Sequence, residues 1–493
     1  MATIEQLAIF QITIPLIVAP LVFLLKNGNR AWFLTLVTSV AMMWVASQLL
    51  VHVLSVGEFV TQIGGWAAPW GIEYRVDTVN AFVLLIVSGM SSIVLMFARQ
   101  SVNQEIESNK RSLFYTSWLL CLTGLLGVTI TGDAFNVFVF LEISSLSSYV
   151  LIAMGRDRRA LTSSFQYLVM GTIGATFILI GIGFLFIVTG TLNMADISER
   201  LSDTSQTRTV RTAFAFIIVG IGLKLAMFPL HLWLPNAYAY APSVASAFLA
   251  ATATKVALYM LLRFIYTVFG FEFSFDLPLS ETLVILSSAA ILVGSVVAIF
   301  QDNLKRLLAY SSVAQIGYML LGVSLATQAG LSAALLHVFN HAVIKGGLFL
   351  VLGCFVFRFG TASLKLLSGK GTQMPWTFAA FIAGGLSLIG VPLTTGFVSK
   401  WQLVTAALDI GWWPVALVVL AGSILAIVYV WRAVEVLYFR PVSDDSQIVK
   451  EAPLELLLPT WLLIGANIYF GINTELSIGV ADVAAHWLMT GTR

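Results

Sequence analysis

About fourteen apolar runs, each long enough to cross a lipid bilayer, follow one another along the 493 residues of this chain. A helix of about 20 apolar residues spans the hydrocarbon core, which is about 30 Å thick. Irregular backbone survives in that core only where protein or water covers it. Charged residues make up only 10% of the chain, against about 25% in soluble proteins. The sequence therefore predicts an all-α polytopic membrane protein with a single membrane domain over residues 1–493.

The order of these runs and the charges between them predict an orientation. The expected spans are roughly 7–25, 31–54, 77–98, 113–131, 134–154, 162–188, 212–230, 243–268, 281–301, 305–325, 330–357, 375–409, 412–439 and 453–473. With the N-terminus outside, sixteen Lys and Arg fall in inner loops, and five fall outside: Arg75, Arg200, Arg208, Arg211 and Arg493. By the positive-inside rule, we expect both termini on the outer side of the membrane. The run 375–409 is long enough to be broken, and 474–490 is expected at the surface.

Composition and motifs exclude several classes of function. The two cysteines, Cys121 and Cys354, form no CxxC motif, so they provide neither an iron–sulfur cluster nor a zinc site. The chain has no GxGxxG motif and no P-loop, which argues against nucleotide-driven chemistry. A net charge of +2 gives no indication of nucleic-acid binding. We therefore expect no cofactor in this chain. The first apolar run lacks the flanks of a signal peptide and is expected to be a retained helix.

Five basic residues fall outside every loop, and these charges are costly within a bilayer. They are Lys224, Lys255, Arg263, Lys345 and Lys400. A charge at the bilayer centre costs about 2.5–3.5 kcal/mol on insertion scales. Arg263 lies about five residues from a helix end and is expected to snorkel to the interface. The depth of the four lysines favours a functional role over snorkelling or pairing for folding alone. Only one carboxylate, Glu142, lies near the middle of a span.

Two of the spans are interrupted by proline close to a lysine. In the segment FPLHLWLP, Pro229 and Pro235 follow Lys224, and in GVPLTTGFVSK, Pro392 precedes Lys400. Proline removes a backbone donor and blocks helix continuation, so both segments are expected to be broken helices. Broken helices that carry buried charges are typical of transporters, where paired interruptions indicate internal repeats.

The segment ALLHVFNHAVIKGG places three titratable groups on one helix face. His337, His341 and Lys345 are spaced four residues apart, so they line about 12 Å of one face. Two histidines at this spacing can share a metal ion, but no carboxylate or cysteine in the segment completes such a site. The alternative, a proton relay that ends in a buried lysine, fits the segment better.

The buried groups suit protons better than metal cations. Burial makes the ammonium form of a lysine less favourable, whereas a nearby carboxylate restores it, so a lysine with a moving counter-ion can load and release a proton. Histidine titrates near neutral pH without help. Sodium prefers a cluster of oxygen ligands, and this interior offers one deep carboxylate against four lysines. The sequence therefore predicts a proton path, with any sodium path elsewhere.

Six motifs together give the chain a family resemblance. FLEISSLSSY, LKLAMFPLHLWLP, APSVASAFLAATATK, LKRLLAYSSVAQIGY, HVFNHAVIKG and GVPLTTGFVSKW occur in this order over nearly the whole chain. The set resembles the antiporter-like subunits of respiratory complex I and their relatives, and within these the D-type subunits of Mrp-type multisubunit cation/proton antiporters. Barely twenty residues follow the last span, too few for the long lateral helix of the complex I end subunit.

The resemblance implies a specific architecture and path. It implies fourteen helices, ten of which form two inverted five-helix repeats at 113–268 and 281–439, with broken helices near 224–235 and 390–400. It also implies a Glu142–Lys224 pair and a hydrated axis that continues through Lys255 and His341 or Lys345 to Lys400. Some family members carry glutamate at the last position, where this chain keeps lysine.

Two functions follow as expectations. The first is the proton-translocating subunit of a multisubunit Na⁺/H⁺ antiporter, a transporter rather than an enzyme, with protons, Na⁺, other membrane subunits and the lipid bilayer as partners. The second is a proton-pumping subunit of a redox complex of the NADH-quinone oxidoreductase or membrane-bound hydrogenase type. The same proton axis would serve both.

Overall fold

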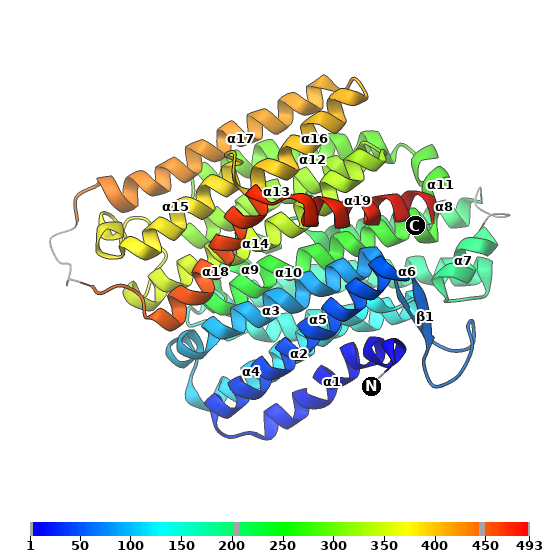
Figure 1. Cartoon of the computed structure of the whole chain (residues 1–493), viewed down its shortest axis with the longest axis horizontal. Coiled ribbons are helices and arrows are strands. Elements are labelled where there is room, and N and C mark those ends of the chain that lie inside the picture. Colours follow the sequence, from blue (N-terminus) through cyan, green and yellow to red (C-terminus); the bar gives the residue numbers. More distant parts are fainter. Residues whose placement is uncertain (1–2, 202–206, 443–448, 492–493) are drawn as a thin grey trace.

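The structure is a computed structural model that describes residues 3–201, 207–442 and 449–491. Arg493, one of the outer basic residues counted above, lies outside these ranges. Within them the chain is almost entirely helical, apart from one antiparallel hairpin of β1 (Phe59–Gln62) and β2 (Glu73–Val76). Figure 1 shows the helices as one bundle in which most elements run along the long axis of the molecule. The predicted all-α class is confirmed.

Twelve helices of the described ranges are long and apolar enough to cross a membrane. They are α1 (Ile4–Leu24), α2 (Gly28–Ser55), α3 (Thr78–Glu105), α4 (Arg111–Ile130), α5 (Ala134–Ala153), α6 (Arg159–Thr189), α10 (Ser243–Leu262), α12 (Leu279–Ile299), α13 (Leu304–Ser324), α14 (Gln328–Phe359), α17 (Trp413–Val434) and α18 (Leu454–Ile472). Short π-helical turns, η2 (Arg263–Val268) and η4 (Glu435–Phe439), extend α10 and α17.

The two remaining expected crossings are the interrupted ones. The first consists of α8 (Arg208–Leu225) and α9 (Trp233–Tyr240), and the second of α15 (Pro375–Ile389) and α16 (Thr395–Asp409). Pro229 and Pro392 lie in the two breaks as predicted, whereas Pro235 lies in the first turn of α9. The other short elements are α7 (Met194–Leu201), α11 (Phe271–Asp276), α19 (Glu475–Thr490), η1 (Ser108–Lys110) and η3 (Lys370–Gln373). The segment 474–490, expected at the surface, forms α19, which packs one face along α3 and α14 and leaves residues such as Leu476 exposed.

The two ends of the bundle differ in character. We call the end where α3 finishes at Glu105 the basic end, because the loops 25–27, 106–110, 155–158 and 360–374 there contain or adjoin most of the expected inner Lys and Arg. The opposite end carries the β1–β2 hairpin and α7. In Figure 1 the marks for the N- and C-termini lie toward this second end.

Two short backbone motifs have the same spacing at opposite ends of the bundle. At the hairpin end, 132–134 pairs with 192–194 through Ala134 N to Leu192 O (2.8 Å) and Met194 N to Gly132 O (2.9 Å). At the basic end, 302–304 pairs in the same way with 362–364, with both hydrogen bonds at 2.8 Å. Each motif joins the start of the second helix of an expected repeat to the end of the third. This pattern supports the proposed division into inverted repeats at 113–268 and 281–439.

Helix α14 lies at the centre of the bundle. It packs against α3, α10, α13, α15, α16, α18 and α19, and most of its 32 residues are buried. By contrast, α1 and α17 leave long apolar side chains exposed, as expected of helices that face lipid or a neighbouring subunit. The fold therefore encloses the helix that carries both histidines of the expected axis.

Candidate functional site

Glu142 and Lys224 meet as the sequence predicted. Glu142 comes from α5 and Lys224 from the last turn of α8, and the lysine Nζ lies 3.4 Å from Glu142 Oε1. Lys224 also donates a hydrogen bond of 2.7 Å to Ser145 Oγ, one turn further along α5. The lysine side chain is 3% exposed and that of Glu142 is 25% exposed. The carboxylate therefore balances the buried ammonium while it keeps one side open.

The first break places Lys224 next to free backbone groups. Helix α8 ends immediately after the lysine, where Ala226 adopts a left-handed conformation (φ 59°). The last carbonyls of a helix lack intrahelical partners, and here Trp233 Nε1 donates to Leu223 O at 2.9 Å. The Trp233 ring stacks on Tyr167 of α6, with centroids 3.9 Å apart. These contacts hold the broken segment in place around the lysine.

Lys255 lies fully buried in the middle of α10. Its Nζ donates to Ala250 O of the same helix and to Thr254 Oγ1 at 3.4 Å. None of the described carboxylates forms a salt bridge with it. An ammonium buried at 0% exposure without a counter-ion is unfavourable. This position therefore favours a lysine whose charge changes during function over one with a fixed charge.

The three groups on α14 share one face, as predicted from their spacing. The rings of His337 and His341 are nearly parallel, with centroids 6.1 Å apart. His337 is held at both nitrogens, by Ser399 Oγ (2.8 Å) and Gln315 Oε1 (2.9 Å). Neither ring nitrogen of His341 has a hydrogen-bond partner in the described parts of the chain. Because buried polar atoms normally have partners, a water molecule beside His341 would supply the hydrogen bonds that these two nitrogens lack.

Lys345 and Lys400 both bind backbone carbonyls and hydroxyls. Lys345 Nζ donates to Leu308 O (2.8 Å) and to Ser311 Oγ of α13. Lys400 Nζ donates to Leu388 O (3.0 Å), Ile389 O (2.9 Å) and Ser423 Oγ (3.2 Å). The two carbonyls belong to the last residues of α15, so the second break supplies the ligands of this lysine. The ammonium also lies 4.7 Å from the centre of the Tyr318 ring.

The structure brings five of the predicted groups into one cluster and leaves two as a separate pair. His341 has Lys255, Lys345 and His337 as electrostatic neighbours, and Lys345 has Lys255 and Lys400. No described contact joins this cluster to Glu142 and Lys224. Among the described residues, no three His, Cys, Asp or Glu side chains gather as a metal site would require. The continuous axis thus needs water between the two groups, and it remains a prediction.

The expectation for Arg263 was wrong. Its side chain is 6% exposed and forms an ion pair with Asp77, the N-cap residue of α3. The guanidinium also donates to Tyr259 Oη at 2.8 Å and lies 4.9 Å from the ring of Trp487 on α19. The partner lies 186 residues away, so no local pattern could indicate it. The only sequence signal was that Asp77 begins an apolar run.

A sixth buried cation was missed because it was assigned to a loop. Lys305 is the second residue of α13, and only 4% of it is exposed. Its position next to Arg306 at a predicted span boundary made it resemble an ordinary surface lysine. The nearby carboxylate Glu105, the last residue of α3, was likewise taken as a helix-end charge.

The fold and the buried groups together define a class of protein. An interior lined by titratable groups beside two broken helices is the arrangement of ion-translocating membrane proteins. The family model described as NADH:quinone oxidoreductase/Mrp antiporter, transmembrane, matches residues 131–426. The chain belongs to this family.

Individual relatives include both oxidoreductase subunits and antiporter subunits. The chain is 40% identical over 441 residues to the N subunit of the NADH-quinone oxidoreductase of Desulforudis audaxviator, covering 86% of this chain and 87% of the relative. It is 30% identical over 484 residues to the D subunit of the Na⁺/H⁺ antiporter of Alkalihalophilus pseudofirmus, covering 97% of both. Among solved structures, it matches a chain of the Mrp complex from Dietzia with a TM-score of 0.90 and 27% identity, covering 100% and 98%.

Proposed function

We propose that this chain is the proton-translocating subunit of a multisubunit Na⁺/H⁺ antiporter of the Mrp type, in the position of the D-type subunit. Protons move along the groups Glu142, Lys224, Lys255, His337, His341, Lys345 and Lys400. The observation that carries this proposal is the pair of buried Lys224 and partly exposed Glu142 next to a helix break. A change in the charge of the lysine costs little free energy only if the carboxylate moves as well. Proton translocation requires this kind of coupling.

Partner subunits and location belong to the same proposal. Glu142 keeps a quarter of its side chain exposed, and an open carboxylate inside a bilayer is costly. A neighbouring membrane subunit that covers it would remove this cost. The excess of Lys and Arg at the basic end supports a cytoplasmic location for that end and an outer location for both termini, in a bacterial inner membrane. Sodium would cross elsewhere in the complex.

The proposal is tested by cation/proton exchange in everted membrane vesicles that contain the complete set of partner subunits. Sodium added to the wild type should dissipate an imposed pH gradient. Lys224→Ala should abolish this exchange while the complex still assembles, because Glu142 loses the charge to which it is coupled. Exchange at a near-normal rate in the assembled variant would make the pair structural only.

A second candidate function has its own support. The 40% identity to the N subunit of a NADH-quinone oxidoreductase favours a proton-pumping subunit of a redox complex. The iron content of the purified native complex distinguishes the two. Iron in stoichiometric amounts would identify the redox complex, and its absence together with sodium-dependent exchange would identify the antiporter.

A further inference from the structure

A buried lysine and a half-buried glutamate hold the same turn at the basic end, outside the path described above. Lys305 of α13 donates from Nζ to Ala241 O at 3.0 Å. Glu105 of α3 accepts from Ser243 N at 2.9 Å and from Ser243 Oγ at 3.2 Å, both at Oε2. The two side chains thus hold opposite sides of the turn 241–243, between α9 and α10. They form no direct salt bridge, although Glu105 acts electrostatically on Lys305.

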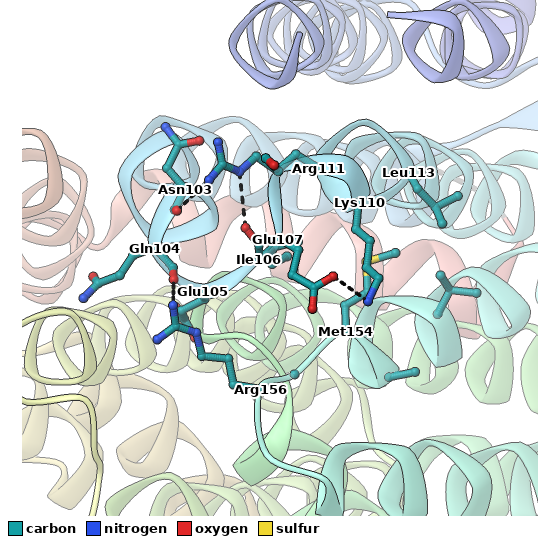
Figure 2. A pocket seen from close by; sticks show the side chains of 14 residues that line it. Asn103, Gln104, Glu105, Ile106, Glu107, Lys110, Arg111, Leu113, Met154 and Arg156 are labelled. Carbon is teal, nitrogen blue, oxygen red and sulfur yellow. Dashed lines mark hydrogen bonds and ion pairs between the residues drawn. The ribbon is translucent and has the colours of Figure 1, made fainter. Parts of the chain in front are cut away.

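Two cavities at the surface of the basic end share Glu105 in their walls. The larger, about 740 Å³, lies between the α3–α4 connection and the end of α5. Figure 2 shows Glu105, Gln104 and Arg156 in its wall, together with the Glu107–Lys110 ion pair. The smaller, about 200 Å³, is lined by Lys305 and also by Gln104, Glu105 and Arg156. Cavities of this size and polarity hold water, so water from the basic surface reaches both charged groups.

The helix that carries Lys305, α13, also contacts Lys345 of the central cluster. Leu308, whose carbonyl oxygen binds Lys345 Nζ at 2.8 Å, follows Lys305 by three residues, a rise of about 4.5 Å along the helix. Ser311, whose Oγ binds the same ammonium, is almost one further turn along α13. Lys345 in turn has Lys255 and Lys400 as electrostatic neighbours. Successive turns of α13 therefore lead from Lys305, in the wall of the smaller cavity, to the groups that bind the Lys345 ammonium.

We propose that Glu105 and Lys305 form the port at which protons pass between water at the basic surface and Lys345. The inference rests on the proposed function. When a proton leaves the protein at the basic surface, the Lys305 ammonium gives it to cavity water or to the Glu105 carboxylate. It then takes one from Lys345 through water or the Ser311 hydroxyl, which accepts one proton as it releases another. The steps run equally in reverse, so the port serves either direction of transport.

The alternative is that the pair only clamps the turn 241–243. Lys305→Arg separates the two, because a guanidinium keeps the charge and the hydrogen-bond donors but does not release a proton. Glu105→Gln keeps an acceptor for Ser243 N but no longer titrates. The charged and titratable groups that face Lys305 across the small cavity are Glu105, Arg156, Asp157, Arg159 and Tyr240. All of them stay unchanged in Lys305→Arg. Lys365→Arg, at an exposed lysine in the loop after α14, is the matched control.

The experiment measures sodium-dependent exchange in everted vesicles, in which the basic end faces the bath, over a series of bath pH values. We expect Lys305→Arg to reduce exchange at least tenfold in assembled complex, Glu105→Gln to shift the dependence on bath pH, and Lys365→Arg to change nothing. Wild-type rate and pH profile in either Lys305→Arg or Glu105→Gln would overturn the port. If the complex with Lys305→Arg does not assemble, the pH dependence of exchange in Glu105→Gln alone tests the port. A wild type without exchange, or an active Lys224→Ala, would instead defeat the proposed function itself.

Discussion

His337 Nδ1 and Ser399 Oγ lie 2.8 Å apart, which ties the central helix α14 to the broken helix α16. Ser399 directly precedes Lys400, so a movement of α16 that displaces the lysine also changes the hydrogen bond of the histidine. Tyr318 strengthens this connection, because its ring lies 5.7 Å from that of His337 and 4.7 Å from the Lys400 ammonium. His337 and Lys400 therefore form one mechanical unit.

Lys400 should tolerate glutamate better than arginine. Transfer of a proton at this position requires a group that gains and loses it, and a carboxylate does so whereas a guanidinium stays protonated. We expect Lys400→Arg to reduce cation/proton exchange at least tenfold and Lys400→Glu to retain part of it, when both are measured in vesicles at equal amounts of assembled complex. Arginine outperforming glutamate would show that Lys400 only anchors the end of α15 through Leu388 O and Ile389 O.

Ordered water should be found beside His341. Both of its ring nitrogens lack partners among the described residues although the side chain is fully buried, and a buried water normally supplies such missing hydrogen bonds. A cryo-electron microscopy map of the complex, at a resolution that shows water, should contain at least one between His341 and Lys255. Apolar side chains filling this space without water would contradict a hydrated path at that point.

Asp77→Asn should strongly destabilise the protein. The pair of Asp77 and Arg263 is buried at the hairpin end, and removal of one partner leaves an uncompensated charge at a cost of about 3–5 kcal/mol. Glu58→Gln is the matched control, since the Arg75–Glu58 pair is partly exposed and such pairs contribute about 0–1 kcal/mol. Thermal unfolding of the purified complex should show a clear loss for Asp77→Asn only. Equal effects would mean that Arg263 finds another partner.

Gly396→Ala should disrupt the second break. A Cβ at this position would lie 1.8 Å from Ser387 O, so α15 and α16 could no longer approach each other. The carbonyls that bind Lys400 belong to the residues after Ser387, and we expect exchange to fall at least tenfold. Gly465→Ala in α18 serves as the control because nothing lies within 4 Å of its added Cβ. Normal exchange in Gly396→Ala would show that the close packing of the break is dispensable.

Much of this architecture follows from local features of the sequence. Apolar length predicts the crossings, and proline predicts both breaks to within a few residues, because each effect acts on the backbone of its own segment. The spacing of His337, His341 and Lys345 predicts their common face for the same reason. The pairing of Glu142 with Lys224 came from the family resemblance, because the sequence offered four intramembrane lysines to the one deep carboxylate.

The rest depends on contacts between distant segments. The partner of Arg263 comes from the start of α3, and the hydroxyl that holds His337 comes from α16. Neither is visible in the local pattern around the arginine or the histidine. Lys255 was expected on a hydrated axis, and the bond from its Nζ to Ala250 O of its own helix could not be read from the sequence. Lys305 was counted as a loop charge because sequence alone does not show which surface residues the neighbouring elements cover.

The enclosure of α14 has a consequence for amide hydrogen exchange. Its backbone is surrounded by α3, α10, α13, α15, α16, α18 and α19, so deuterium reaches its amides only when these helices separate from it. The amides of such a segment exchange only through global opening, so their exchange reports the free energy of unfolding. Amides of peripheral helices exchange through local fluctuations. Deuterium uptake along α14 would thus report how often the entire subunit opens, and a ligand that raised this uptake would be loosening the molecule at its centre.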